Sequence, residues 1–574
     1  MRILEIGGNL WTAVWILAED EADHGSPSVT PFPKFPEDPF REPPEFPDEP
    51  RLHSVAILVG EQCYGHCMWR HNQFILPGLI RKRETMDRRE FVAGAGALGA
   101  GLILPARRAG RTPAEADRII ALGPPGPGTN VYEPHIAIDP RSPDRIAVAA
   151  QYGIRGGRGG RNIQLWVSED AGRTWFTTRV PRPRLDGEFA ADALVSFHAD
   201  GGLLVTSNFG DKWVSDWNDG RSWSRRSAPP LDQMLAFTSK TPPPADLMTR
   251  GGIAASRTVD RGQTLAATVI PGVSPGADKT SMALDRFEGS PHRGNVYVAW
   301  SDQVPSIHVA RSTDGGRTFA HPAEVRTLAV AAMHQLAVRP DGTVHSMWTY
   351  GSMPGIPGGG PMGDPPDGGK PIYHAVSTDG GATFSEPKIV GAHAGAGMVG
   401  IPSVAVDAKG VMLWVWGQAD SLPDPTVRPI LQARHRLYAI RSEDGITWSA
   451  PFELCPSVPA GTHMGLPAVT TQGTRWWILS YLADNKETRV GLLRSDDGGK
   501  RFELDRVLAT RPFPADEISL MGSYLLRFAD DIPQIGDYVG VTALGSRVAS
   551  AFVLPETNSP TSRATVYVAL SEVR

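Results

Sequence analysis

The chain has 574 residues and a formal net charge of −5, and it has no basic run interleaved with aromatic residues. This charge pattern excludes nucleic acid as a partner. Its 62 glycines, 51 prolines and 15 tryptophans favour many short strands joined by turns, with repeated packing under hairpins. Of three cysteines only Cys455 lies beyond residue 85, so a disulfide within the rest of the chain is impossible and zinc-ligand spacing is absent there.

Residues 1–85 lack the pattern of a folded domain. The segment Pro31–Pro50 is rich in proline and acidic residues and has no hydrophobic periodicity. We therefore interpret residues 1–85 as a disordered or non-native N-terminal extension. Cys63 and Cys67 lie near two histidines, but this spacing is a weak indication of a metal site.

Residues 86–116 resemble a twin-arginine signal peptide. Arg88 and Arg89 precede an Ala/Gly-rich apolar run, Val92–Ala106, and small residues follow at Ala114 and Ala116. A short buried helix is the alternative, but the glycines disfavour it. The resemblance implies export through the twin-arginine translocation machinery, to the periplasm or the extracellular space. The run is too short to span a membrane, so no transmembrane segment is expected in the mature chain, which would begin near Asp117.

From residue 130 onward, short apolar strands follow one another in sets of four. Ile136–Ile138, Ile146–Val148 and Gln164–Val167 open the first set. We interpret residues 212–250 as an insertion in the second set, although they could form a degenerate set of their own. Only three strands follow the last set, and Arg118–Leu122 could complete a final one. This pattern predicts seven sets, or six if the chain ends pair differently.

A short motif, S/T-x-D-x-G-x-T-aromatic, closes most of these sets. The hydroxyl and the carboxylate can accept hydrogen bonds from the amides of their own turn, and the glycine supplies a positive φ. The aromatic ring can then lie under the hairpin. The six copies are Ser168–Trp175, Thr258–Leu265, Ser312–Phe319, Ser377–Phe384, Ser442–Trp448 and Ser495–Phe502.

This motif resembles the Asp box, or BNR repeat, of sialidases and related β-propellers. The resemblance implies an all-β fold over residues 117–574, a single β-propeller of four-stranded antiparallel blades. In that family the boxes lie on the turn between the third and fourth strands, away from the ligand site. We therefore expect a structural role for the six box aspartates, which are Asp170, Asp260, Asp314, Asp379, Asp444 and Asp497.

Polar residues recur where the first strand of each blade begins, on the face opposite the boxes. We expect them to form a ring at the channel mouth. The ring would comprise Glu133, Asp192, Asp278, His334, His463, Asp537 and Tyr538, with His135 beside it. His135, His334 and His463 are candidate substrate ligands. Asp278 and Asp537 could hold a structural divalent cation such as calcium, and no other cofactor is required.

The sialidase resemblance implies roles for part of this ring. Tyr538 and Glu133 would stand at nucleophile-like positions and Asp192 at an acid-like one. However, Glu133 occupies the place of an arginine in that family, and no arginine triad can be assigned. We therefore expect a glycoside hydrolase acting on a glycan or glycoconjugate other than a simple sialoside.

Two features of the same face leave alternatives open. A loop with Arg155, Arg158 and Arg161 is either a substrate-binding element or a solvated loop. The whole face could also belong to a non-catalytic propeller that binds a glycan or a protein.

Overall fold

The computed structural model divides the chain into two units, Met1–Gly110 and Arg111–Arg574. The residues that the structure describes are 54–59, 62–70, 73–75, 117–123, 129–154, 162–181, 189–210, 251–260, 262–272, 277–301, 306–327, 332–349, 370–393, 397–419, 435–459, 461–484, 487–511, 536, 538–555 and 564–573. In the smaller unit they form one antiparallel sheet of β1 (Ser54–Val59), β2 (Gln62–Arg70) and β3 (Gln73–Ile75). The predicted export signal, residues 86–116, lies outside them.

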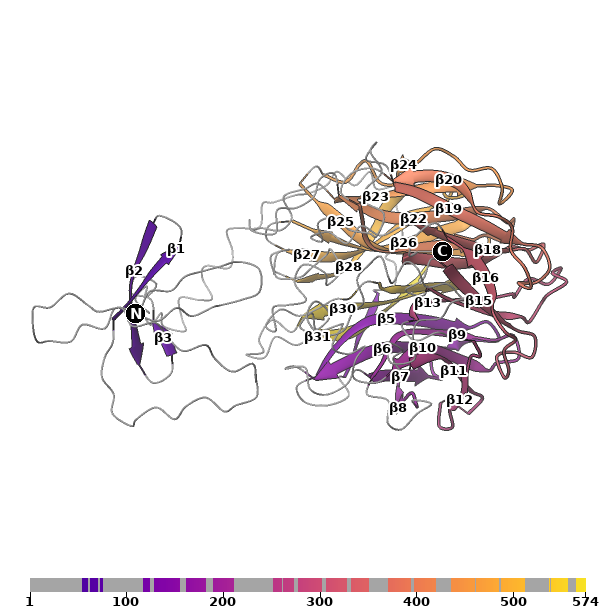
Figure 1. Cartoon of the computed structure of the whole chain (residues 1–574), viewed down its shortest axis with the longest axis horizontal. Helices are drawn as coiled ribbons and strands as arrows, with labels where there is room; N and C mark the ends of the chain where they lie inside the picture. The colour runs from indigo at the N-terminus through magenta and orange to yellow at the C-terminus, as the bar shows by residue number, and fades with distance from the viewer. Residues whose placement is uncertain are drawn as a thin grey trace, which may run out of the picture. The chain divides into compact units, whose positions relative to one another are not determined.

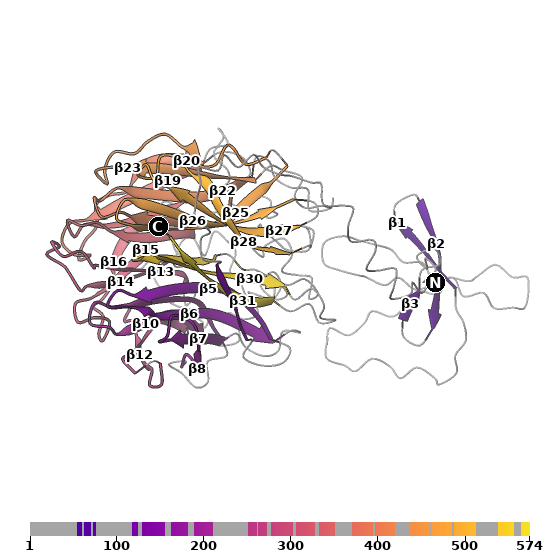
Figure 2. The same cartoon turned by 180° about the vertical axis from the view of Figure 1, so that it is seen from behind.

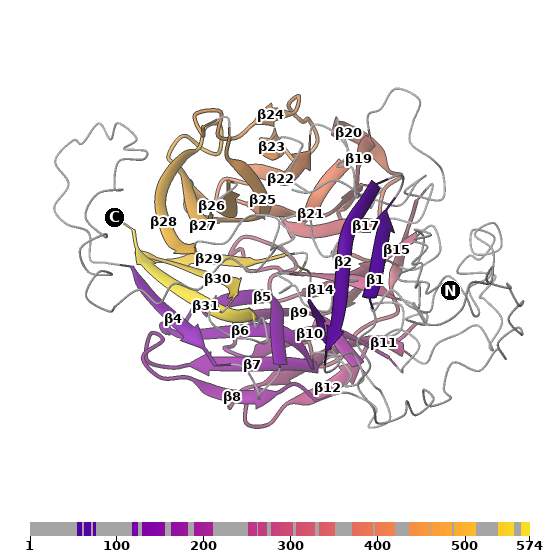
Figure 3. The same ribbon diagram turned by 90° about the vertical axis from the view of Figure 1, so that its left-hand side faces the viewer.

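The larger unit is a seven-bladed β-propeller, as the sequence predicted (Figures 1 and 2). Each blade is a four-stranded antiparallel sheet, and the first strands of neighbouring blades contact one another around the whole ring. Figure 3 shows β5, β21 and β25 towards the middle of the ring and β8, β12 and β24 at its rim. The described residues include no helix that could cross a membrane.

The strands follow the chain in order from the first blade to the sixth. Blades one to three consist of β5 (Thr129–Asp139), β6 (Ser142–Ile154), β7 (Asn162–Ser168) and β8 (Phe176–Arg179); β9 (Phe189–Phe197), β10 (Leu203–Gly210), β11 (Gly251–Thr258) and β12 (Ala266–Val269); and β13 (Asp278–Leu284), β14 (Val296–Ser301), β15 (Ser306–Ser312) and β16 (Ala323–Arg326). Because β10 pairs directly with β11, residues 211–250 connect two strands of one blade, as expected for an insertion.

The remaining blades repeat this plan, and the last one closes the ring. They consist of β17 (Ala332–Val338), β18 (Val344–Thr349), β19 (Lys370–Ser377) and β20 (Lys388–His393); β21 (Gly397–Val406), β22 (Met412–Ala419), β23 (His435–Ser442) and β24 (Phe452–Glu453); β25 (His463–Gln472), β26 (Arg475–Ala483), β27 (Thr488–Ser495) and β28 (Glu503–Arg511); and β29 (Gly540–Leu544), β30 (Arg547–Pro555), β31 (Ala564–Glu572) and β4 (Arg118–Leu122).

The strand β4 completes the seventh blade, which confirms the predicted closure. It pairs antiparallel with β31, with Ala121 opposite Tyr567. Leu122 is buried in the core of this blade. Asp117, just before β4, forms a 2.9 Å ion pair with Arg506 of the sixth blade. The start of the unit is therefore bound to both of its last two blades.

The six copies of the repeat motif form the predicted turn between third and fourth strands. In the third blade, Ser312 donates a 2.7 Å hydrogen bond to Asp314 and accepts one from the amide of Gly316. Asp314 in turn accepts hydrogen bonds from the amide and the hydroxyl of Thr318. Gly316 has a φ of +86°, and a Cβ there would lie 2.5 Å from Leu204 of the second blade. The turn thus also packs against the preceding blade.

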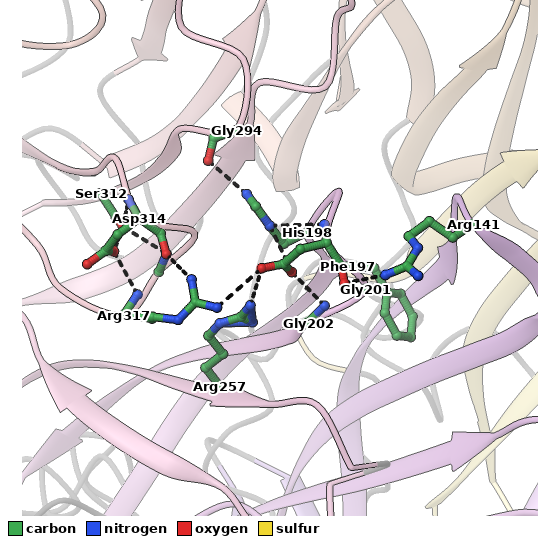
Figure 4. A network of polar contacts seen from close by, with 12 residues as sticks. Arg141, Phe197, His198, Gly201, Gly202, Arg257, Gly294, Ser312, Asp314 and Arg317 are labelled. Carbon is green, nitrogen blue, oxygen red and sulfur yellow. Dashed lines mark hydrogen bonds and ion pairs between the residues drawn. The ribbon is translucent and has the colours of Figure 1, made fainter.

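A second set of contacts on this face, centred on Asp200, joins the second and third blades (Figure 4). Asp200 follows β9, and its carboxylate contacts His198, Arg257 and Arg317 at 2.9, 2.5 and 3.4 Å. Burial raises the pKa of Asp200, but hydrogen bonds from the amide of Gly202 and from the side chains of His198 and Arg257 hold this pKa well below its usual range. His198 also contacts the carbonyl of Gly294 in the third blade at 2.9 Å. These contacts hold neighbouring blades together.

The repeat turns predict acid-sensitive stability. Hydrogen bonds from Thr174 lower the pKa of Asp170 to about 2, and those from Thr258 and Thr264 lower that of Asp260 to about 2. Because the folded pKa lies below the unfolded value of about 3.9, their contribution is present above pH 4 and lost as the pH falls towards 2. We expect the Tm of D170N and D260N to fall less than that of the parent between pH 5 and pH 2. An equal fall would contradict this role.

Ring closure by β4 predicts unequal effects of two neighbouring substitutions. Leu122→Ala should lower the free energy of unfolding by about 2–5 kcal/mol, because it leaves a cavity in the core of the seventh blade. Ile119→Ala is the matched control, since this side chain is 38% exposed on the same strand; its effect should be about 0.5 kcal/mol. Denaturant unfolding measures both values. Equal effects would show that β4 is not packed as described.

Candidate functional site

The first strands carry a β-bulge at one level, near the end of each blade that lies opposite the repeat turns. In six blades the register with the second strand shifts there, and only β29 pairs without a shift. In the first blade, Tyr132 pairs with Gln151 and His135 with Ala149, which leaves Glu133 and Pro134 in the bulge. A bulge re-aims the side chains that it carries.

Four bulges place a residue other than glycine at positive φ. The φ values are +55° for Glu133, +51° for Asp192, +54° for Lys279 and +52° for Leu466. For such residues the left-handed conformation costs about 1–2 kcal/mol relative to the right-handed one. Strain of this kind is typical of functional sites, where the surrounding structure maintains it. Three of the four residues carry ionisable side chains, and two of these had been predicted from the sequence.

The structure brings Glu133 and Asp192 together through a third residue, Gln151. Both acidic residues are buried, and Gln151 is 1% exposed. The amide nitrogen of Gln151 donates a hydrogen bond to the Glu133 carboxylate. Its amide oxygen accepts one of 3.3 Å from the backbone N–H of Asp192. One side chain of β6 therefore connects the bulges of two blades.

Asp192 has a second group of partners. Asn208 of β10 donates a 2.8 Å hydrogen bond to its carboxylate, and the backbone amide of Lys279 donates one of 3.3 Å. The ammonium of Lys279 lies 3.8 Å from the same carboxylate. Thr280 donates a 2.8 Å hydrogen bond to the Asp192 carbonyl. The bulges of blades one, two and three are thus connected through Asp192.

His334 supplies a neutral imidazole beside this network. It is 1% exposed, and neither ring nitrogen has a hydrogen-bond partner of normal geometry among the described residues. Burial lowers its pKa to about 4, although the Ala299 carbonyl and the negative charge of Asp192 act in the opposite direction. Near pH 7 the ring is therefore uncharged, with one nitrogen able to donate a hydrogen bond and the other able to accept one.

Tyr538 reaches the network from the seventh blade. It precedes β29, and its hydroxyl lies 3.4 Å from the carbonyl of Ala193 in the second blade. Gly536, two residues earlier, has a φ of +94° and packs against Glu133; a Cβ there would lie 2.1 Å from the Glu133 Cγ. The seventh blade and the first blade therefore meet at Glu133.

The other two histidines lie in contacts between strands. The Nδ1 atom of His135 lies 3.1 Å from the carbonyl oxygen of Val195 in the next first strand, and burial lowers the His135 pKa to about 4. Serines at equivalent positions make comparable contacts further round the ring, where the amide of Leu336 donates to Ser281. His463 of the sixth blade lies 3.1 Å from His435 of the fifth blade, measured between Nδ1 atoms.

Several predicted site residues lie outside what the structure describes. These are Arg155, Arg158, Arg161 and Asp537, together with the side chain of Asp278. Among the described residues, no group of three or more histidine, cysteine, aspartate or glutamate side chains is arranged to hold a metal ion.

The sequence analysis did not predict roles for Gln151, Asn208 and Lys279. A signal for the first two existed, because each is an amide side chain near the end of a second strand that contains an apolar run, Ile146–Ala150 in β6 and Leu203–Val205 in β10. Lys279 and Asp278 are neighbours in the sequence. Only the structure of the bulge shows that Lys279 is the residue with the positive φ.

A groove of about 520 Å³ lies away from this network, on the face of the repeat turns. Its charged groups are largely paired with one another, since Arg145 contacts Asp139 at 3.2 Å and Glu169 at 3.1 Å. Arg145 also donates a 2.7 Å hydrogen bond to the carbonyl of Gly201 in the second blade. We therefore interpret these residues as a junction between blades.

No protein-family model and no curated protein matches the sequence. Solved structures resemble it at low identity. A protein of unknown function from Dyadobacter fermentans is 14% identical, with a TM-score of 0.41, and the alignment covers 80% of this chain and 99% of that one. A leech intramolecular trans-sialidase is 12% identical, with a TM-score of 0.40 and coverage of 75% and 73%. A polysaccharide lyase described as an ulvan lyase is 12% identical, with a TM-score of 0.43 and coverage of 78% and 94%.

The contact between Gly536 and Glu133 predicts a position-specific effect of alanine. Gly536→Ala adds a methyl group that must displace Glu133, whereas Gly545→Ala has open space within 4 Å at a similarly positive φ of +62°. Both variants incur the backbone strain, but only the first adds overpacking of about 1–3 kcal/mol. Unfolding in urea should show this difference. Equal destabilisation would mean that Gly536 does not support Glu133.

Proposed function

We propose that the propeller is an exported carbohydrate-active enzyme that hydrolyses glycosidic bonds at the connected bulges of blades one, two and three, next to Tyr538 of blade seven. The observation that carries this proposal is the pair of buried acidic residues at positive φ, Glu133 and Asp192, coupled by Gln151. Strained, buried carboxyl groups from two adjacent blades are a costly arrangement for a purely structural purpose.

The chemistry of the network suits hydrolysis. Glycosidases use two carboxyl groups, one to protonate the leaving oxygen and one to stabilise or attack the anomeric carbon. In our proposal Asp192 protonates the leaving oxygen as the C–O bond breaks. Glu133 accepts the proton of the Tyr538 hydroxyl as the tyrosine oxygen attacks the anomeric carbon. Ionised Asp192 then takes a proton from water as the water oxygen displaces the tyrosine, and Glu133 returns its proton to the tyrosine oxygen. Lys279 and Asn208 hold Asp192 in place.

The positive charge of Lys279, next to Asp192, bears on which class of glycan we propose as the substrate. Lys279 contacts the Asp192 carboxylate, and an arginine triad of the kind that the resemblance to sialidases would require cannot be assigned. A single ammonium is a poor substitute for the bidentate grip of several guanidinium groups on a carboxylate. We therefore propose a glycan other than a simple sialoside. We also propose that the repeat turns are Asp boxes. A calcium ion would bind near Asp278 and Asp537.

The assignment predicts a loss of turnover with retention of fold. E133Q and D192N preserve shape and remove charge and proton transfer, so each should lower kcat by about 10²–10⁴-fold. A panel of aryl glycosides and polysaccharides, assayed for reducing ends, identifies a substrate for the parent. Asp341→Asn, an exposed aspartate in the turn between β17 and β18, serves as control. Unchanged turnover in both site variants would overturn the roles, and glycan binding by an inactive parent would favour a binding module.

Export predicts a defined start of the mature protein. If residues 86–116 are a twin-arginine signal, N-terminal sequencing of the secreted chain should find Asp117 or a neighbour as the first residue. That residue forms the ion pair with Arg506 that precedes β4, so processing would leave the closing strand intact. Replacing Arg88 and Arg89 by lysine should abolish export. A secreted chain that retains residues 1–85 would contradict the prediction.

A further inference from the structure

We infer that Gln151 is a positioning residue that sets the relative placement of Glu133 and Asp192. It bonds the side chain of one and the backbone of the other, and it belongs to neither bulge. The inference rests on the proposed function for its catalytic consequence, but the contact itself can be tested separately.

The argument begins with the two ends of the amide. A carboxamide has one donor end and one acceptor end, and here each end faces a group of the opposite kind. The donor end faces the Glu133 carboxylate, and the acceptor end faces the Asp192 N–H. The amide therefore has one orientation that satisfies both partners, which fixes the Glu133 carboxylate relative to the second blade.

The surroundings of Gln151 leave little freedom to adopt another arrangement. The side chain is 1% exposed. Its backbone pairs with Tyr132 on one side and Ile163 on the other, in the middle of three strands. A buried amide without its partners incurs a desolvation penalty, so both contacts are expected to persist.

This placement has a consequence for proton transfer. Glu133 and Asp192 lie on different blades, and two carboxyl groups must keep a defined separation to act as a pair. A glutamate at position 151 would face Glu133 with a second carboxyl group, and like charges raise the pKa of a carboxyl group. A methionine would keep the volume of Gln151 and remove both hydrogen bonds.

Gln164 provides a matched control in the same blade. It is a buried glutamine of β7 whose amide nitrogen donates to the carbonyls of Thr178 and Leu165, at 2.7 and 3.3 Å. Neither of these contacts involves an acidic residue. Substitutions at Gln164 therefore report the effect of disturbing a buried glutamine alone.

The first experiment compares pH profiles of kcat/KM on the substrate found for the parent. Q151E should move the acid limb upward by about one pH unit, because Glu133 must be ionised to act. Q151M should lower kcat about 10–100-fold with little change in KM, as expected for a misplaced catalytic group. Q164E and Q164M should leave the acid limb where it is. An unchanged limb in Q151E, or equal shifts in both glutamate variants, would overturn the inference.

The second experiment tests the contact without using activity. A double-mutant cycle in urea unfolding combines Q151M with E133Q, and the control cycle combines Q164M with E133Q. We expect coupling in the first cycle and none in the second. Absence of coupling would overturn the inference even in an active enzyme. Coupling in a parent that turns over no glycan would instead refute the proposed hydrolysis and leave Gln151 as the residue that fixes the two bulges.

Discussion

Closure of the ring by β4 is the constraint on which the rest of the structure depends. An open ring would leave the outer edge of the last blade exposed and separate the seventh blade from the first. Pairing between β4 and β31 prevents this, and the ion pair between Asp117 and Arg506 adds a contact with the sixth blade. Only in a closed ring do β5 and β29 lie in contact, which places Gly536 against Glu133.

The two faces of the propeller use different kinds of interaction. On the face of the repeat turns, the aspartate of each repeat accepts hydrogen bonds from hydroxyls and amides of its own turn, as Asp314 does from Thr318 and Ser312. Such contacts are local and keep the aspartates ionised. On the opposite face the acidic residues have partners in other strands and other blades. Their arrangement therefore depends on blade packing and can be changed from a distance.

The bulges connect the architecture to the proposed chemistry. A regular first strand would alternate its side chains between the two faces of the blade. The extra residue in each of β5, β9 and β13 breaks that alternation at one level and re-aims Glu133, Asp192 and Lys279. Hydrogen bonds from Gln151, Asn208 and Thr280 then hold the strained backbone and its side chains. Stability and function thus depend on the same few contacts.

Local patterns in the sequence were enough to predict the repeat turns, a propeller of seven or six blades and the closing strand. Turns such as Ser312–Phe319 are local, and the apolar period of the strands follows directly from burial on both faces of each blade. The sequence also placed Glu133, Asp192 and Tyr538 at the starts of first strands. Which polar groups meet depends on the tertiary structure. Contacts such as that between Gln151 and Asp192, which lie 41 positions apart, depend on the bulge register and on blade packing. No local pattern encodes either, because a shift of one residue sends a side chain to the other face.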